Sequence, residues 1–181
     1  MKARLMVVAL AVPLLVLAAC GGAETATPST QTEPGTESEP EPKDLEAKIT
    51  IVMGEELPLM YFADSDRMRG GPFTLPAGKI VGIRVINSGE LEHEIAFGRE
   101  FDASAGAYEE NLFASLPTDI FVFKPVKVEI EQSVFAAIEA EPHGDFWIHT
   151  VFPPEMKGVW EIACFVEGHY DAGMKAAFII Q

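Results

Sequence analysis

The sequence predicts an all-β domain of the sandwich or barrel class, and three observations support this prediction. Gly and Pro are frequent, with 15 and 13 among 181 residues, and long helical runs are few. From Ala47 onward, short apolar runs rich in Val, Ile and Phe alternate with Gly, Pro and Asn, which is typical of strands joined by turns. The chain that remains after its N-terminal region has the length of one hydrophobic core, so we expect one domain over residues 47–181.

Residues 1–19 have the pattern of a signal peptide. Lys2 and Arg4 form a basic start, and Leu5–Ala19 is an apolar run that is short for a membrane span. The run ends in LAAC, which resembles the lipobox of bacterial lipoproteins, and this resemblance implies a lipidated Cys20 at the mature N-terminus. An uncleaved membrane anchor is the alternative. Both place the remaining chain outside the cytoplasm, in the periplasm or on the outer face of the plasma membrane.

Residues 20–46 are predicted to be a lipidated cysteine followed by a disordered tether. The segment Gly21–Glu46 consists mainly of Thr, Pro, Glu, Ser and Gly and has almost no apolar side chain, so it cannot offset the entropy of folding. As a flexible coil it would reach roughly 30 Å, which lets a tethered domain scan the space above a membrane.

The chain is strongly acidic, with a formal net charge of −15. Without Lys2 and Arg4, 11 basic residues remain against 28 acidic ones, so the mature charge is −17. Nucleic acid is therefore not an expected partner. The acidic surface either docks a basic partner, such as a c-type cytochrome, or serves solubility, and both readings stay open. We expect a monomer.

The strands are predicted from apolar runs bounded by turn residues, and two segments interrupt them. Ala63–Phe73 reads as a polar turn, and Arg99–Thr118 is rich enough in Ala and Glu for a short helix in an insertion. The predicted strands are Lys48–Val52, Leu57–Ala63, Lys79–Asn87, Glu92–Phe97, Val126–Gln132, Val134–Glu139, Phe146–Val151, Val159–Phe165 and Lys175–Ile180.

Cys164 is the one cysteine left once Cys20 is assigned to the lipid, so no internal disulfide can form. A lone thiol in an oxidising compartment must be buried or bound to be stable. Alternation along the strand Val159–Phe165 puts Cys164 on the same face as Trp160 and Ile162. We therefore expect the thiol at the inner edge of the sheet, where the strand ends.

Cys164 begins the motif C-x4-H-x4-M, which continues through His169 and Met174. A soft thiolate, an imidazole and a weak thioether form a donor set that suits both oxidation states of copper. Gly168 and Gly173 allow the tight turns that would bring the three donors together. Met174 as simple core packing is the alternative, and it is less consistent with its place directly after a glycine.

A second imidazole must come from elsewhere in the chain. His93 is the best candidate, because it follows a predicted strand and a turn built on Asn87 and Gly89. His143 and His149 are its rivals, but one stands in a turn and the other on an apolar strand. We expect both of these histidines to be structural or surface residues.

With these residues the chain resembles the cupredoxins, the type 1 blue-copper proteins of the plastocyanin, azurin and auracyanin kind. The resemblance covers about Ala47–Gln181 and rests on G-x-W-x3-C-x4-H-x4-M preceded by an upstream Asn and His. It implies a Greek-key β-sandwich, one type 1 copper ion held by His93, Cys164, His169 and Met174, and one-electron transfer without enzyme activity. It also implies a redox partner, such as a c-type cytochrome, an oxidase or another respiratory component.

The resemblance carries two further expectations. Family members present the loop histidine, here His169, within an apolar surface patch, which Gly168, Tyr170, Ala172 and the pair Pro153–Pro154 would form in this chain. Many plastocyanin-like members also have Asn directly after the first histidine, where this chain has Glu94. The hydrogen bonding around the thiolate is therefore an open question at the level of sequence.

A different class of function remains possible for the same donors. A lipoprotein that captures copper for delivery or resistance would need a similar set of ligands. A carrier of electrons should hold copper tightly in both oxidation states, whereas a delivery protein should release Cu(I) to a competing site. An enzyme is not expected, because the sequence shows no open metal site and no general acid/base pair.

Overall fold

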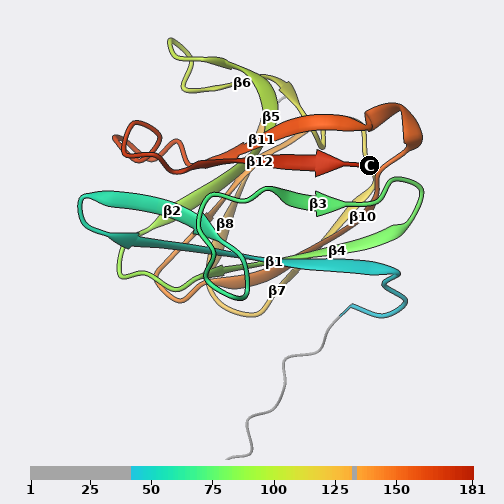
Figure 1. Cartoon of the computed structure of the whole chain (residues 1–181), viewed down its shortest axis with the longest axis horizontal. Coiled ribbons are helices and arrows are strands. Elements are labelled where there is room, and N and C mark those ends of the chain that lie inside the picture. The colour runs from blue at the N-terminus through green and yellow to red at the C-terminus, as the bar shows by residue number, and fades with distance from the viewer. Residues whose placement is uncertain (1–41, 132–133) are drawn as a thin grey trace, which may run out of the picture. The chain divides into compact units, whose positions relative to one another are not determined.

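The computed structural model describes residues 42–131 and 134–181 of the chain. The predicted signal peptide, Cys20 and nearly all of the predicted tether lie outside the described residues, so these assignments remain predictions. Within the described part, 12 strands form two sheets that stack face to face, as Figure 1 shows. The predicted all-β sandwich is therefore confirmed. No helix in this part of the chain is long and apolar enough to cross a membrane.

The first sheet has five strands in the order β2-β1-β4-β10-β7. Its strands β1 and β4 are parallel, and its other pairs are antiparallel. Apolar residues of the three central strands point into the core, because alternate side chains of a strand share one face. The strands are β1 (Ala47–Glu56), β2 (Leu59–Ala63), β4 (Ile80–Asn87), β7 (Thr118–Val122) and β10 (Asp145–Val151).

The second sheet has the order β3-β12-β11-β5-β9-β8, and β6 pairs with the outer half of β5. A single turn of 3₁₀ helix, η1 (Pro154–Met156), precedes β11. The strands are β3 (Phe73–Leu75), β5 (His93–Asp102), β6 (Ala107–Asn111), β8 (Val126–Glu131), β9 (Val134–Ala140), β11 (Gly158–Ala163) and β12 (Lys175–Ile180).

The hydrophobic core lies between the two sheets. Aromatic side chains dominate its centre, where the Phe97 ring meets the rings of Phe113 and Phe178 edge to face, with centroids 5.1 and 5.3 Å apart. Trp160 is 3% exposed, and Ile162 and Cys164 are fully buried, as the alternation of β11 predicts. The thiol therefore enters the core where this strand ends.

The expected short helix in Arg99–Thr118 is wrong. This segment instead extends β5 to Asp102, turns, and returns as β6, with Phe101 opposite Tyr108 in the register. Gly98 makes the pairing possible, because a side chain there would collide with Tyr108 and the Glu110 carbonyl. Aromatic cross-strand pairing thus outweighs the weak helix preference of the Ala and Glu residues.

The sandwich has two distinct ends. The loop between β11 and β12 lies at the left of Figure 1 near the β1–β2 turn, and the connection from β10 through η1 to β11 lies at the right. The predicted copper-binding loop is therefore at the end opposite to Pro153–Pro154. The expectation that this proline pair joins the patch around His169 is wrong, since a full strand, β11, separates the two loops.

Candidate metal centre

Three predicted ligands meet at one end of the sandwich. His93 is the first residue of β5, Cys164 directly follows β11, and His169 lies in the loop that leads to β12. One donor atom from each residue lies within 4.8 Å of the others, and all three residues are buried. The antiparallel pairing of β5 with β11 brings His93 close to Cys164 and His169, which are far from it in the sequence.

The separations of these donor atoms fit a single metal ion. The two Nδ1 atoms of His93 and His169 are 3.2 Å apart, and Cys164 Sγ is 3.4 Å from His169 Nδ1. An ion bonded at about 2.0–2.3 Å to three donors in one plane would hold them about 3.5–3.8 Å apart. The two measured sides of the triangle are within a few tenths of an ångström of this, and the third is no longer than 4.8 Å, so the group can hold one copper ion.

Backbone hydrogen bonds close the ligand loop. The amide of Met174 donates to the His169 carbonyl at 3.0 Å, and the amide of Cys164 donates to the Met174 carbonyl at 3.1 Å. Gly168 and Gly173 have φ values of +82° and +96°, a region that strongly favours glycine. The turn chemistry predicted for this loop is confirmed, and it fixes the spacing of the donors without help from a metal.

Met174, the fourth predicted ligand, ends the loop that carries Cys164 and His169. It is fully buried, directly precedes β12, and is bonded through its backbone to both other ligands of the loop. Its role as a ligand stays a prediction, because these backbone contacts would also suit a residue that only packs in the core.

Backbone amides supply the hydrogen bonding around the Cys164 sulfur. The Glu94 amide donates to Cys164 Sγ at 3.2 Å, and the Val166 amide also donates to this sulfur. The side chain at position 94 is not needed for this contact. Burial raises the pKa of the Cys164 thiol to about 12, against the opposing effect of these two amides. Among the described residues, Cys164 is a buried free cysteine.

Asn87 fixes the loop that presents His93. Its side-chain amide donates to the carbonyls of Leu91, Ala140 and Glu141 at 2.8, 2.8 and 3.1 Å, while its Oδ1 accepts from the Gly89 amide at 2.9 Å. Asn87 is fully buried, so these contacts are shielded from water. The turn predicted from Asn87 and Gly89 is confirmed, and it also joins this loop to the end of β9.

Glu55, at the end of β1, is a residue of the site that the sequence reasoning missed. Its Oε2 lies 2.8 Å from His93 Nε2, on the side of the ring away from the other donors. Burial would raise the pKa of Glu55, but hydrogen bonds from His93 and from the amides of Glu90 and Leu91 together lower it. No local motif marks this glutamate, since the contact joins segments 38 residues apart.

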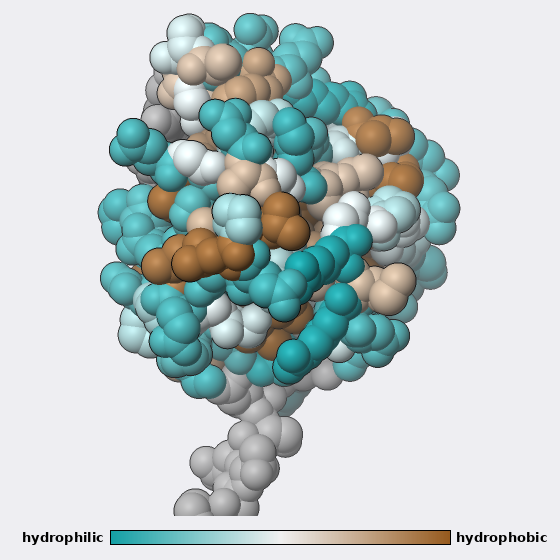
Figure 2. Space-filling view, turned by 60° about the vertical axis from the view of Figure 1, so that its left-hand side comes forward, coloured by the Kyte–Doolittle hydropathy of each residue, from teal (hydrophilic) through white to brown (hydrophobic). Residues whose placement is uncertain are grey.

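His169 is the most exposed of the predicted ligands, with 7% of its area exposed. Burial and the neighbouring His93 lower its pKa, which favours the neutral ring that a metal ligand requires. Around it, Gly168 is exposed and Tyr170 and Ala172 are half-buried, in line with the expected patch. Figure 2 brings this end of the molecule forward and shows hydrophobic areas set among hydrophilic ones.

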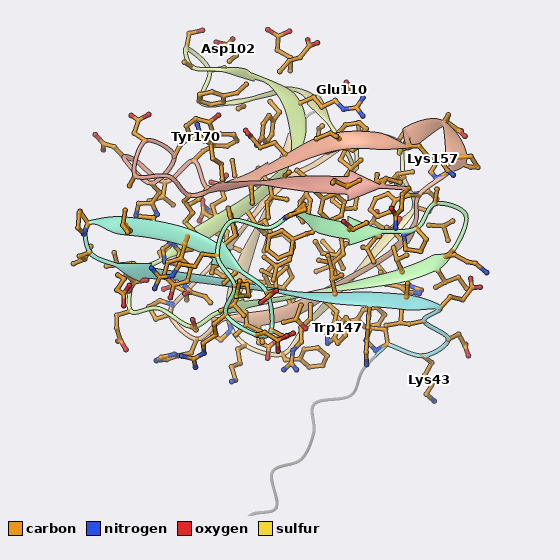
Figure 3. The ribbon with its side chains drawn as sticks, viewed as in Figure 1. Lys43, Asp102, Glu110, Trp147, Lys157 and Tyr170 are labelled. Atoms are coloured by element: carbon orange, nitrogen blue, oxygen red, sulfur yellow. The ribbon has the colours of Figure 1, made fainter. Side chains whose placement is uncertain are left out.

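Tyr170 connects the ligand loop to the β5–β6 hairpin. The Tyr170 ring stacks on the Phe101 ring with centroids 4.3 Å apart, and the Phe165 ring also stacks on the Phe101 ring, with centroids 5.1 Å apart. Figure 3 shows Tyr170 on the loop beneath the hairpin that carries Asp102. The hydroxyls of Tyr170 and Tyr108 both donate to Glu161 Oε1. This aromatic cluster braces the loop from outside the sandwich.

Neither rival histidine joins the donor cluster found among the described residues. His143 is exposed in the β9–β10 turn with a φ of 65°. His149 lies on β10, where its Nδ1 is 3.5 Å from Asp119 Oδ2. Their assignment as structural or surface residues agrees with these positions.

Comparison with known proteins adds information about the fold. No protein-family model matches the chain, and no curated protein matches its sequence. Similar solved structures include a multicopper oxidase from Campylobacter jejuni, with 13% identity, a TM-score of 0.50, and coverage of 78% of this chain and 31% of that chain. The chain thus spans about a third of the oxidase.

Two smaller proteins are also similar. Auracyanin from the photosynthetic bacterium Roseiflexus castenholzii is 23% identical, with a TM-score of 0.47 and coverage of 75% of this chain and 96% of that one. Rusticyanin from Thiobacillus ferrooxidans is 16% identical, with a TM-score of 0.44 and coverage of 74% and 77%. At these identities a likeness concerns the fold alone. The chain folds as a two-sheet β-sandwich, the architecture that the resemblance in its sequence implied.

Proposed function

We propose that this chain carries single electrons through one copper ion held by His93, Cys164, His169 and, more weakly, Met174. The observation that carries the proposal is the buried triangle of two imidazole nitrogens and one thiol, with donor separations of 3.2 and 3.4 Å. Copper, when bound to such a set, supplies a one-electron couple, because the mixture of hard and soft donors suits both oxidation states.

The protein contributes rigidity and exclusion of water. The loop is closed by backbone bonds between its own ligands, and two amides are aimed at the sulfur. Donors held in place in this way need little rearrangement when the charge of the site changes. Among the four proposed ligands, His169 has the largest exposed fraction, 7%, so electrons would enter and leave through its ring.

The partner and the location follow from charge and from the N-terminal sequence. Glu90, Glu92, Glu167 and Asp171 are exposed on the loops that surround the donors. Such a rim would steer a partner with a basic face, such as a c-type cytochrome or a terminal oxidase, towards His169. The signal peptide and the lipid on Cys20 would keep the domain outside the cytoplasm and close to the membrane.

The first test is the visible and electron-spin-resonance spectrum of the full chain with one equivalent of Cu(II). An intense thiolate charge-transfer band with narrow copper hyperfine splitting is expected. Cys164→Ser should abolish the band, whereas the matched variant Cys20→Ser should keep it, because only the first removes a predicted copper ligand. Colour that persists in Cys164→Ser would refute the assignment of the site.

Weak colour in the unchanged protein, with an ordinary tetragonal copper signal, would refute the electron-transfer proposal. The fold would then serve the capture or delivery of copper. Exchange adds a second criterion, because a delivery protein should lose Cu(I) to a competing chelator that leaves an electron carrier loaded.

The role of Met174 is tested by Met174→Gln. This variant should keep copper but lower its reduction potential, because an amide oxygen is a harder donor than a thioether and favours Cu(II). Met156→Gln is the matched control, since Met156 lies in η1 at the other end of β11. Equal potentials in the two variants would show that Met174 only packs in the core.

A further inference from the structure

The imidazole of His93 has two nitrogens with different partners. Nδ1 faces the other donors, 3.2 Å from His169 Nδ1, and Nε2 faces Glu55 Oε2 at 2.8 Å. The His93 side chain is fully buried and that of Glu55 is 10% exposed. An ionised carboxylate can only accept hydrogen bonds, so Nε2 carries the proton in this contact. When the ring is neutral, Nδ1 is then left with a free lone pair.

The carboxylate of Glu55 is itself held in place. The amide of Glu90 donates to Oε1 at 2.7 Å, and the amide of Leu91 also donates to this carboxylate. Gly89 leaves the space that the carboxylate occupies, because a Cβ at this position would collide with Oε2. The turn between β4 and β5 therefore forms a socket for Glu55, and Asn87 stabilises the same turn through the Gly89 amide.

We propose that Glu55 is a positioning residue of the copper site, acting through His93. This inference rests on the proposed copper function and assigns a tuning device to it. The hydrogen bond from Nε2 selects the tautomer that leaves Nδ1 to the metal and fixes the plane of the ring. The negative charge also makes the imidazole a stronger donor, which favours the oxidised ion, because that ion carries one more positive charge.

The expected size of the effect follows from comparable sites. Removing the carboxylate partner of a metal-binding histidine typically lowers metal affinity by about 10- to 100-fold. We expect Glu55→Gln to lower the Cu(II) affinity about tenfold relative to the Cu(I) affinity, at the low end of this range, since it removes the charge but leaves a side chain of the same shape. For a one-electron couple, tenfold corresponds to a rise of about 59 mV in reduction potential.

Glu56→Gln is the matched control. It removes the same charge one residue along β1, but the side chain of Glu56 is 72% exposed and pairs with Arg69. Screening by water makes a distant effect of this charge on the copper small. A rise in potential in Glu55→Gln that Glu56→Gln does not share therefore reports on the contact with His93 and not on net charge.

A second measurement needs no metal. In the metal-free full chain, at a pH where the ring is neutral, ¹⁵N chemical shifts should show His93 protonated at Nε2. Glu55→Ala should lose the predominance of this tautomer, because no carboxylate then accepts a hydrogen bond from Nε2. Gly89→Ala should act like Glu55→Ala, since the added methyl displaces the carboxylate while the glutamate remains in the chain.

The outcomes separate this inference from the proposed function. An unchanged tautomer in Glu55→Ala, or a potential in Glu55→Gln no higher than in Glu56→Gln, would overturn the role of Glu55 and leave a blue-copper protein. Absence of the intense band in the unchanged protein would refute the electron-transfer function, and the tautomer measurement would still decide whether Glu55 orients His93.

Discussion

Replacing Asn87 by alanine should destabilise the domain strongly, because one side chain joins three segments. Its two amide protons are shared among the carbonyls of Leu91, Ala140 and Glu141, and its oxygen accepts from Gly89. These contacts amount to three hydrogen bonds, since the amide has two protons to donate. At about 1 kcal/mol each, the loss is about 3 kcal/mol, a large part of the 5–15 kcal/mol typical of a domain.

The assay is urea unfolding of the metal-free protein, followed by intrinsic tryptophan fluorescence. Asn87→Ala should move the transition midpoint to lower urea without changing its slope, and should lower the melting temperature by roughly 10 °C. Ser88→Ala is the matched control, because the exposed Ser88 makes one side-chain bond, from Oγ to the Met53 carbonyl at 3.1 Å. This control should lose no more than about 1 kcal/mol.

A loss in Asn87→Ala as small as that in Ser88→Ala would refute this reasoning. The turn before β5 would then be held by its own backbone, and the buried amide would be dispensable. The same variant should also bind copper more weakly, because the turn positions both His93 and the socket of Glu55.

Two further predictions concern stability and access. Arg84→Met should lower the free energy of unfolding by about 3 kcal/mol, because it leaves the buried Asp145 carboxylate without the guanidinium that donates two hydrogen bonds to it. Arg69→Met, which breaks an exposed ion pair, is the control and should lower it by less than about 1 kcal/mol. Equal losses in free energy would show that burial does not make the Arg84 pair more important than the Arg69 pair. In a metal-free Cys20→Ser chain, Cys164 should react with a thiol reagent far more slowly when the chain is folded than after unfolding, because the thiol is fully buried and its pKa is raised. Fast labelling of the folded chain would show that the thiol is open to solvent.

The ligand loop could be predicted from sequence because its information is local. Cys164, His169 and Met174 lie within 11 residues, and the glycines that turn the loop stand directly before two of them. The alternation of β11 also placed the thiol correctly, since period-two burial follows from strand geometry alone. His93 needed the further assumption that a second strand returns to the same edge, which the pairing of β5 with β11 bears out.

Other parts of the structure depend on contacts that no short segment contains. The strands β3, β6 and β7 were not predicted, because each is short and is defined by the neighbour with which it pairs. The hairpin of β5 and β6 was read as helix from its Ala and Glu content, whereas Phe101 and Tyr108 pair across it. Glu55 was missed for the same reason, since only the folded β1 brings it to His93.

The direction of β1 determines at which end of the sandwich the chain enters the domain. This strand starts at Ala47, beside Val81, and reaches the Glu55 socket eight residues later, a span of roughly 26 Å. The chain therefore enters the sandwich at the end remote from His169. If Cys20 carries a lipid, the tether joins the domain at the end opposite to His169. We then expect the His169 end to face away from the point of attachment, open to partners that diffuse in the aqueous phase.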